Sequence, residues 1–237
     1  MRRERGIIVR SRRLLNRSGW PLKRDVRHQP MSADDWFRNT SWSTATAARF
    51  EEKLRRARGK SQYLRIQACS LADSHPQVAL ALLERYFALG EPFDFAQAHC
   101  DSARAYVALG HMDEAVAAYE AALAREAAFP NLLTQAYVEL PYLVATRRIA
   151  AHYPRARRVL ESFAGRLTFP VDHFKWHAAC ALINAAEAAL ALAGSEARAA
   201  LDHARRAHSG FSRHPTVGLV DTAHGDTIRA LEALVDA

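Results

Sequence analysis

Three side chains with metal-binding chemistry stand at helical spacing in the last third of the chain. His173, His177 and Cys180 occupy positions i, i+4 and i+7, so a helix would present two imidazoles and a thiol on one stripe. Zinc prefers such ligands, but a tetrahedral site needs a fourth. No fourth ligand is evident nearby, and the stripe is also the apolar face of an alanine-rich segment. We therefore expect core packing or groove lining here and no cofactor, with a small-molecule or metal pocket as the alternative.

Other catalytic arrangements lack their usual sequence frames. No glycine-rich loop is suited to cradle phosphates, and no strand–turn–helix elbow surrounds a serine. No paired carboxylates stand out on an inner helix face. We therefore expect a protein that is not an enzyme.

The composition indicates an all-α protein. Apolar residues make up 49% of the 237 residues, against only 10 glycines and 9 prolines, and the alternation typical of strands is rare. Cys69, Cys100 and Cys180 lie in helical apolar patterns without a CxxC pair, which predicts free thiols in a reducing compartment. No apolar run approaches the ~18 residues of a membrane span. We expect a cytoplasmic protein, and the excess of arginine over lysine indicates a GC-rich bacterial source.

Residues 1–30 differ in composition from the rest of the chain. They hold ten arginines and lysines against two acidic residues, which accounts for the whole formal net charge of +8. Three interpretations stay open: a start assigned upstream of Met31, an ordinary solvated tail, or a disordered arm that binds nucleic acid or an anionic surface. Because residues 31–237 are formally neutral, we do not expect them to attract nucleic acid.

The clearest structural signal is a pair of amphipathic segments between Ala96 and Phe129. Small and aromatic residues repeat every three or four positions in both halves, which places them on one face of each helix. Gly110 stands where the first helix must end, and Asp113 is expected to cap the second. One such pair cannot bury its apolar faces alone, so neighbouring pairs are expected.

This stretch resembles a tetratricopeptide repeat (TPR), a helix–turn–helix unit of about 34 residues. The family's tryptophan position holds His99 here, and the closing proline comes late, as Pro130. The resemblance implies a right-handed α–α superhelix, a TPR-like solenoid of about four helix pairs with helical caps. The positions that carry it are Ala103, Tyr106, Gly110, Ala115, Tyr119 and Ala122.

Further helix pairs are expected at residues 61–90, 131–167 and 170–214. Their architecture resembles the family more than their motifs do. The second helices carry a small residue at the position equivalent to Ala115. These small residues are Ala79, Ala156 and Ala199.

Prolines and glycines predict where these helices begin and end. Pro76 suits the first turn of a helix. Pro141 falls inside a helical pattern that starts at Leu133, and it predicts a kink or a break. Gly194 and the serine after it are expected to turn the chain after a long helix that reaches Leu192.

Two segments are expected to close the ends of a single domain over residues 31–237. Residues 31–60 carry three large aromatic side chains ahead of a capping helix. We expect these rings to form a plug over the first helix, with a recognition patch as the alternative. Residues 215–237 are expected to form a C-terminal capping helix. The aromatic residues are Trp36, Phe37 and Trp42.

The resemblance also implies which residues face a binding groove. In TPR proteins, exposed positions of the first helix of each pair line the concave surface and hold an extended peptide or a partner helix. Carried over, the best-matched unit supplies Gln97, Cys100, Arg104, Val107 and Ala108, and the other pairs supply Leu64, Ala68, Ala145, Arg148, Asn184 and Ala188. Flanking these positions are Arg65, Asp101, Tyr142 and His177.

This mixed surface lacks the cluster of lysines, arginines and asparagines that marks the family's carboxylate clamps, so we do not expect capture of an acidic C-terminus. We expect a non-enzymatic scaffold that binds a segment of a partner protein in its concave groove. The groove positions are alternatively only solvated helix faces. A second copy of the chain is a further candidate partner, packed on the outer alanine-rich faces. Nucleic-acid binding through residues 1–30 is the main rival function.

Overall fold

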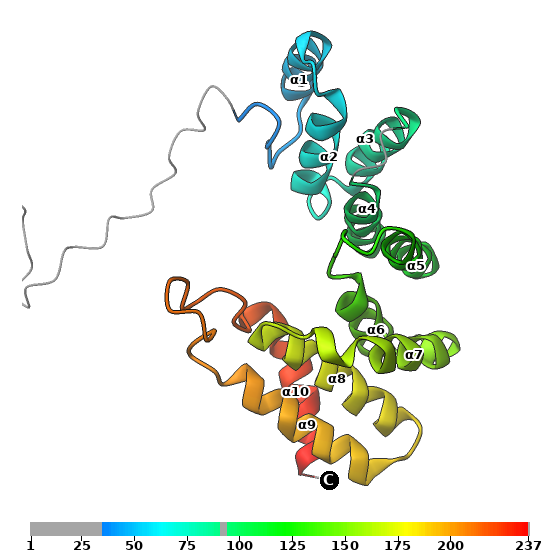
Figure 1. Ribbon diagram of the computed structural model, residues 1–237, viewed down its shortest axis with the longest axis vertical. Helices are drawn as coiled ribbons and strands as arrows, with labels where there is room; N and C mark the ends of the chain where they lie inside the picture. The colour runs from blue at the N-terminus through cyan, green and yellow to red at the C-terminus, as the bar shows by residue number, and fades with distance from the viewer. Residues whose placement is uncertain (1–34, 91–93, 237) are drawn as a thin grey trace, which may run out of the picture. The chain divides into compact units, whose positions relative to one another are not determined.

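The computed structural model describes residues 35–90 and 94–236 of the chain. Within these residues it contains ten α-helices, three short 3-10 helices and no strand (Figure 1), which confirms the expected all-α class. The α-helices are α1 (Thr44–Arg56), α2 (Lys60–Leu71), α3 (Pro76–Ala88), α4 (Phe95–Leu109), α5 (Met112–Ala128), α6 (Ala136–Thr146), α7 (Tyr153–Phe163), α8 (Pro170–Ala186), α9 (Leu190–Ala204) and α10 (Gly225–Val235). The 3-10 helices are η1 (Ala150–His152), η2 (Ala164–Arg166) and η3 (Thr222–His224).

The chain divides into two units, residues 1–35 and 36–237. The interpretations given for residues 1–30 lie outside the described residues. None of the helices that the structure describes is long and apolar enough to cross a membrane.

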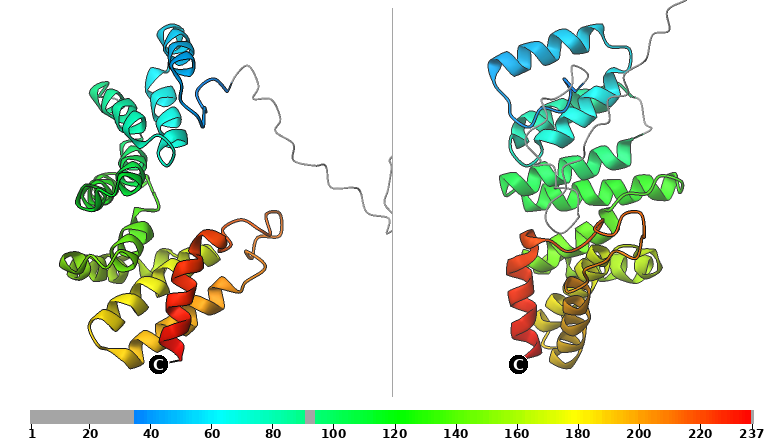
Figure 2. Two further views of the ribbon diagram at one scale, coloured as in Figure 1. Left: turned by 180° about the vertical axis from the view of Figure 1, so that it is seen from behind. Right: turned by 90° about the vertical axis from the view of Figure 1, so that its left-hand side faces the viewer.

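Eight of these helices form four pairs that follow one another along the chain. The partners are α2 with α3, α4 with α5, α6 with α7, and α8 with α9. Both views of Figure 2 show α4 and α5 side by side. Successive pairs also touch, because α3 packs on α4, α5 on α6, and α6 on α8. The helix α10 returns to pack on α9 and α8.

Local signals explain several helix ends. The Ser43 hydroxyl accepts a hydrogen bond from the Thr46 amide and so caps α1. Pro76 and Pro170 occupy first-turn positions of α3 and α8, where a missing amide hydrogen costs nothing. Gly110 ends α4 as predicted, in the left-handed conformation with φ +79°.

The aromatic segment before α1 packs into the core. The Trp36 ring lies 4.9 Å from the Tyr63 ring and 5.4 Å from the Phe50 ring, measured between centroids. Trp42 lies 5.6 Å from Phe50, and Phe37 lies 4.8 Å from Tyr63. These rings bury apolar area between α1 and α2.

The structure corrects the start of the third pair. Leu133 was expected on an inner helix face, but it precedes α6 and is 67% exposed. The reason is a tertiary contact: the Glu126 carboxylate accepts a hydrogen bond from the Thr134 amide at 2.7 Å and holds this segment in a turn. Of the kink or break predicted at Pro141, the break does not form: α6 runs through this residue as one helix.

The turn of the fourth pair was also placed wrongly. Gly194 lies inside α9, and α8 ends earlier, at Ala186. The turn falls at Ala188, which adopts φ +61°, and Leu192 is 60% exposed on α9 rather than part of a long first helix. A Cβ at Gly194 would lie 3.4 Å from the carbonyl oxygen of Leu234. Gly194 therefore faces α10 inside α9, at a position where an added Cβ would make an ordinary van der Waals contact.

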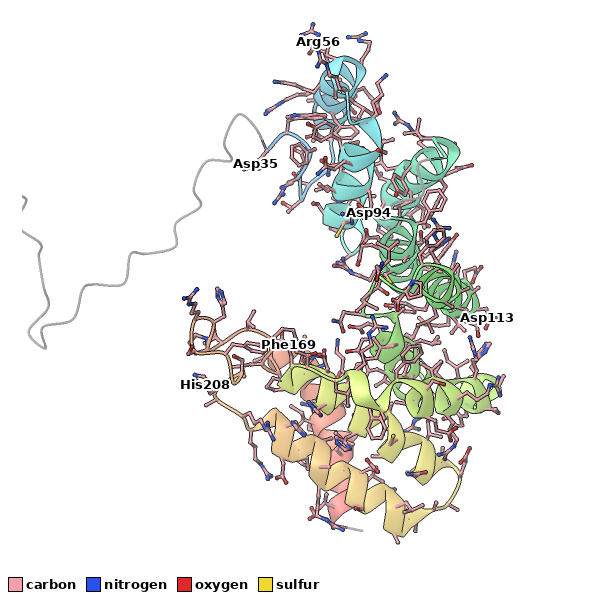
Figure 3. All side chains as sticks on the ribbon, in the orientation of Figure 1. Asp35, Arg56, Asp94, Asp113, Phe169 and His208 are labelled. Carbon is pink, nitrogen blue, oxygen red and sulfur yellow. The ribbon has the colours of Figure 1, made fainter. Side chains whose placement is uncertain are left out.

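The expected cap of α5 is also different in the structure. Asp113 does not cap α5, because His111 occupies the capping position and the Asp113 side chain is 89% exposed (Figure 3). A carboxylate in the first turn still interacts favourably with the positive end of the helix dipole.

Among the small residues of the second helices, Ala79, Ala115 and Ala156 are fully buried. In α9 the fully buried small residues are Ala197 and Ala200, and Ala199 is only partly buried.

Candidate binding groove

Two adjoining hollows lie where α4, α5 and α6 meet. Their volumes are about 240 and 340 Å³, and both are lined by Arg104, Tyr119 and Glu139. We call the two together the α4–α6 groove. Its other lining residues are Asp73, Gln97, Cys100, Val107, Gln135, Tyr142, Leu143, Thr146 and Arg147.

Helical periodicity places the walls of the groove. Gln97, Cys100, Arg104 and Val107 are spaced by three or four residues, so α4 presents all of them on one face. These are four of the five groove positions that the resemblance implied for this helix. On α6 the same spacing joins Glu139, Tyr142 and Thr146. The buried Tyr119 of α5 lies between the two faces.

Two ion pairs occupy the groove. The Arg104 guanidinium donates to the Asp73 carboxylate and lies 3.6 Å from the sulfur of Cys69. The Lys175 ammonium donates to Glu139 Oε1 at 2.6 Å. Arg147 is exposed and has no ion pair with any residue in ranges 35–90 and 94–236. Among the described residues, the groove therefore offers Arg147 as a cation without an ion pair, beside two neutralised pairs.

The reactive side chains of the groove are held in their protonated forms. Burial raises the pKa of the Cys100 thiol to about 12. Burial, reinforced by the nearby Glu139 carboxylate, also raises the pKa of the Tyr119 phenol. A thiol must lose its proton to become a nucleophile, so Cys100 contributes a neutral surface at pH 7.

Arg65, Gln97 and Asp101 meet below this surface, between α2 and α4. Asp101 is fully buried, and its carboxylate accepts hydrogen bonds from Arg65 at 3.3 Å and Gln97 at 3.3 Å. Arg65 also donates to Asp94 at 3.1 Å, at the start of α4 (Figure 3). Burial raises the pKa of Asp101, although the Arg65 guanidinium opposes that shift. Asp101 and Arg65 therefore join two helices instead of meeting a partner directly.

The remaining predicted groove residues are dispersed. The Tyr142 hydroxyl hydrogen-bonds His224 Nδ1 of η3 and Thr227 Oγ1 of α10, both at 2.9 Å, while its side chain lines the groove. Arg148 is exposed after α6, with φ +54°, and does not line the groove. Asn184 is buried, and its amide oxygen accepts from Arg157 of α7 at 2.9 Å.

Several positions implied by the resemblance are core residues. Leu64, Ala68 and Ala145 are between 0% and 3% exposed, so none of them is available to a partner. Their helices use the faces expected for the groove to pack on neighbouring helices. Conversely, Glu139 and Arg147 line the groove but were not among the residues predicted for it. The α6 periodicity that places Tyr142 in the groove was the signal that could have found Glu139.

His177 belongs to a different cluster, between α8 and α9. Its Nδ1 lies 2.7 Å from Glu196 Oε2, and its ring stacks with that of His203. The rings of His173 and His203 are parallel, with centroids 4.5 Å apart. Burial and the nearby Arg206 cation lower the pKa of His203 to about 4, so its imidazole is neutral at pH 7.

This cluster differs from the trio that the sequence suggested. One ligand nitrogen from each of His173, His177 and His203 lies within 4.8 Å of the other two, and Cys180 does not belong to the group. Helical spacing alone linked Cys180 to the histidines of α8, whereas the contribution from α9 depends on how the pair packs. No local signal in the sequence joins His203 to His173.

Comparison of the chain with models of protein families, with curated proteins and with solved structures found no match.

Proposed function

We propose that this chain is a non-enzymatic, TPR-like solenoid scaffold that holds an extended segment of a partner protein in the α4–α6 groove. The observation that carries the proposal is that the groove positions implied by the resemblance agree with the residues that line the two hollows. The resemblance implied Gln97, Cys100, Arg104 and Val107 as groove positions, and these residues line the two adjoining hollows.

The arrangement of the pairs supports the scaffold. Four helix pairs follow one another and each packs on the next, as repeat units must do to bury their apolar faces. First helices of successive pairs, α4 and α6, supply opposite walls of the groove. Opposite walls made of first helices are expected for a concave groove of this kind, and they support the proposal. The protonated state of Cys100 and Tyr119 is consistent with binding instead of nucleophilic chemistry.

The lining residues indicate the chemistry of the segment. Val107, Leu143 and the Tyr142 ring offer apolar contact at one end of the groove, beside the uncompensated Arg147. We therefore expect a segment in which an apolar side chain is close to a carboxylate. The Arg104–Asp73 and Glu139–Lys175 pairs add hydrogen-bonding groups without net charge. Affinity would come from a few such anchors, not from the whole contact area.

The test compares capture of proteins from native lysate by the full chain and by two single variants, Val107→Glu and Arg147→Glu. Each variant alters a groove residue, so we expect the same partner to be lost from both. The matched control is Arg148→Glu, because it makes the same charge change one residue away and outside the groove. Circular dichroism would verify that all variants retain their helices.

A partner that Arg148→Glu retains, and that both groove variants lose, would support the proposal and supply the segment for peptide mapping. Equal capture by all four proteins would reject the groove as the binding surface. If only Arg148→Glu failed to capture the partner, the binding surface would be the turn that follows α6.

A further inference from the structure

A second candidate site lies between α8 and α9, where three imidazoles gather. His173 and His177 project from successive turns of α8, and His203 comes from the last turn of α9. One ligand nitrogen of each lies within 4.8 Å of the other two. All three side chains are half-buried, and none of them lines the α4–α6 groove. From this geometry we infer a binding site for a single zinc ion, ligated by His173, His177 and His203.

The hydrogen bonding around the cluster is that of a metal site. With its hydrogen on Nδ1, His177 donates to Glu196 Oε2 at 2.7 Å, which leaves the Nε2 lone pair for a metal ion. Metal-binding histidines commonly make such a bond to a carboxylate, since it fixes the tautomer and raises the basicity of the ligand. Glu196 also supplies negative charge close to the cation.

An unsatisfied atom points to the same conclusion. Nδ1 of His203 is buried and has no hydrogen-bond partner among residues 35–90 and 94–236. A buried polar nitrogen without a partner is costly, and coordination of a metal ion by this nitrogen would supply the missing partner. No hydrogen bond within the described residues fixes the rings of His173 or His203, so their rotation would break no such bond.

Binding of one shared ion requires the rings of His173 and His203 to rotate. The rings of His173 and His203 are nearly parallel, with an angle of 5° between their planes, whereas a shared ion must lie in the plane of each ring. Rotation of one or both rings about their side-chain bonds, out of the stacked arrangement, would be needed to bring their lone pairs onto one ion. Three imidazole ligands with water in the fourth position form a common zinc arrangement, and imidazole suits zinc better than it suits calcium or magnesium. Bound zinc would then join α8 to α9.

The experiment uses the full chain and Zn²⁺ alone, titrated against a chromophoric chelator. We expect one equivalent to bind, and we expect His203→Asn to weaken the affinity about 100-fold or more because it removes a direct ligand. Glu196→Ala should weaken it about tenfold, as is usual for a residue that orients a ligand. Cys180→Ala and the distant, exposed His214→Ala are the controls, and both should bind zinc as the unaltered chain does.

A spectroscopic readout keeps the test independent of whether the variants fold. Co²⁺ bound to the unaltered chain should show the visible bands of tetrahedral coordination without the near-ultraviolet charge transfer of a thiolate ligand. Zinc should also raise the unfolding temperature of the unaltered chain but not that of His203→Asn. The inference is overturned if the chain binds no zinc, if His203→Asn binds it equally well, or if a thiolate band appears that Cys180→Ala removes. These outcomes do not bear on the α4–α6 groove.

Discussion

At the scale of single residues, Gly218 shows how strongly one backbone position is determined by its surroundings. It adopts φ +65°, and a Cβ placed there would lie 2.5 Å from the side chain of Phe169. Its carbonyl oxygen accepts a hydrogen bond from Val171 at 2.9 Å, near the start of α8. The segment between α9 and η3 is thereby attached to the fourth helix pair.

We expect Gly218→Ala to lower the free energy of unfolding by about 1–2 kcal/mol for the left-handed backbone and by about 1–3 kcal/mol more for the overlap with Phe169. Urea unfolding followed by circular dichroism would measure this. Gly90→Ala is the matched control, because Gly90 has φ +67° with no atom within 4 Å of the added Cβ. An equal loss in both variants would show that the Phe169 contact relaxes without cost.

At the scale of elements, α2 and α4 are held together by a buried ion pair below the groove. Asp101 is 0% exposed, and Arg65 reaches it from α2 while also contacting Asp94. This ion pair therefore helps to position the wall of the groove that Gln97 and Arg104 form.

Replacing Arg65 by leucine should cost about 3 kcal/mol of stability, since it leaves a buried carboxylate without the guanidinium that faces it. The double variant Arg65→Leu with Asp101→Leu should recover part of this loss, because it removes both charges. The control is Arg85→Leu, whose pair with Glu51 is about half-exposed and should contribute less than about 1 kcal/mol. Similar losses of stability in Arg65→Leu and Arg85→Leu would show that the buried Arg65–Asp101 ion pair does not stabilise the fold.

At the scale of the whole chain, charge and fold are separated along the sequence. The net charge of +8 resides in residues 1–30, whereas the core contacts described above lie within residues 36–237. The basic segment and the helical domain can therefore be tested independently.

A chain that begins at Met31 should unfold with the same free energy as the full chain, within about 0.5 kcal/mol. If residues 1–30 are the nucleic-acid-binding arm of the rival function, the full chain should bind non-specific DNA at about 50 mM salt and release it by about 200 mM, because such binding depends on counterion release. The shortened chain should bind at neither concentration. Fluorescence anisotropy with labelled duplex DNA would measure both proteins. DNA binding by the shortened chain would assign a nucleic-acid site to the helical domain.

The amino-acid sequence by itself determined the features that depend on neighbours within about one helical turn. Periodic apolar residues predicted an all-α chain, and Pro76 and Gly110 marked a helix start and a helix end where the structure has them. The resemblance to a TPR implied the α4 positions, and their spacing of three or four residues places them on one face of that helix. Capping and periodicity act locally, so they can be read without the fold.

The tertiary structure alone decided which side chains meet across helices. Gly194 suggested a turn, but the carbonyl of Leu234 approaches it inside α9. Asp101 was expected to flank the groove, yet Arg65 of another helix meets it in a buried position. His203 joins His173 and His177 only because α8 and α9 pack together. Each of these contacts links residues far apart in the sequence, and their energy depends on burial and packing, which periodicity does not specify.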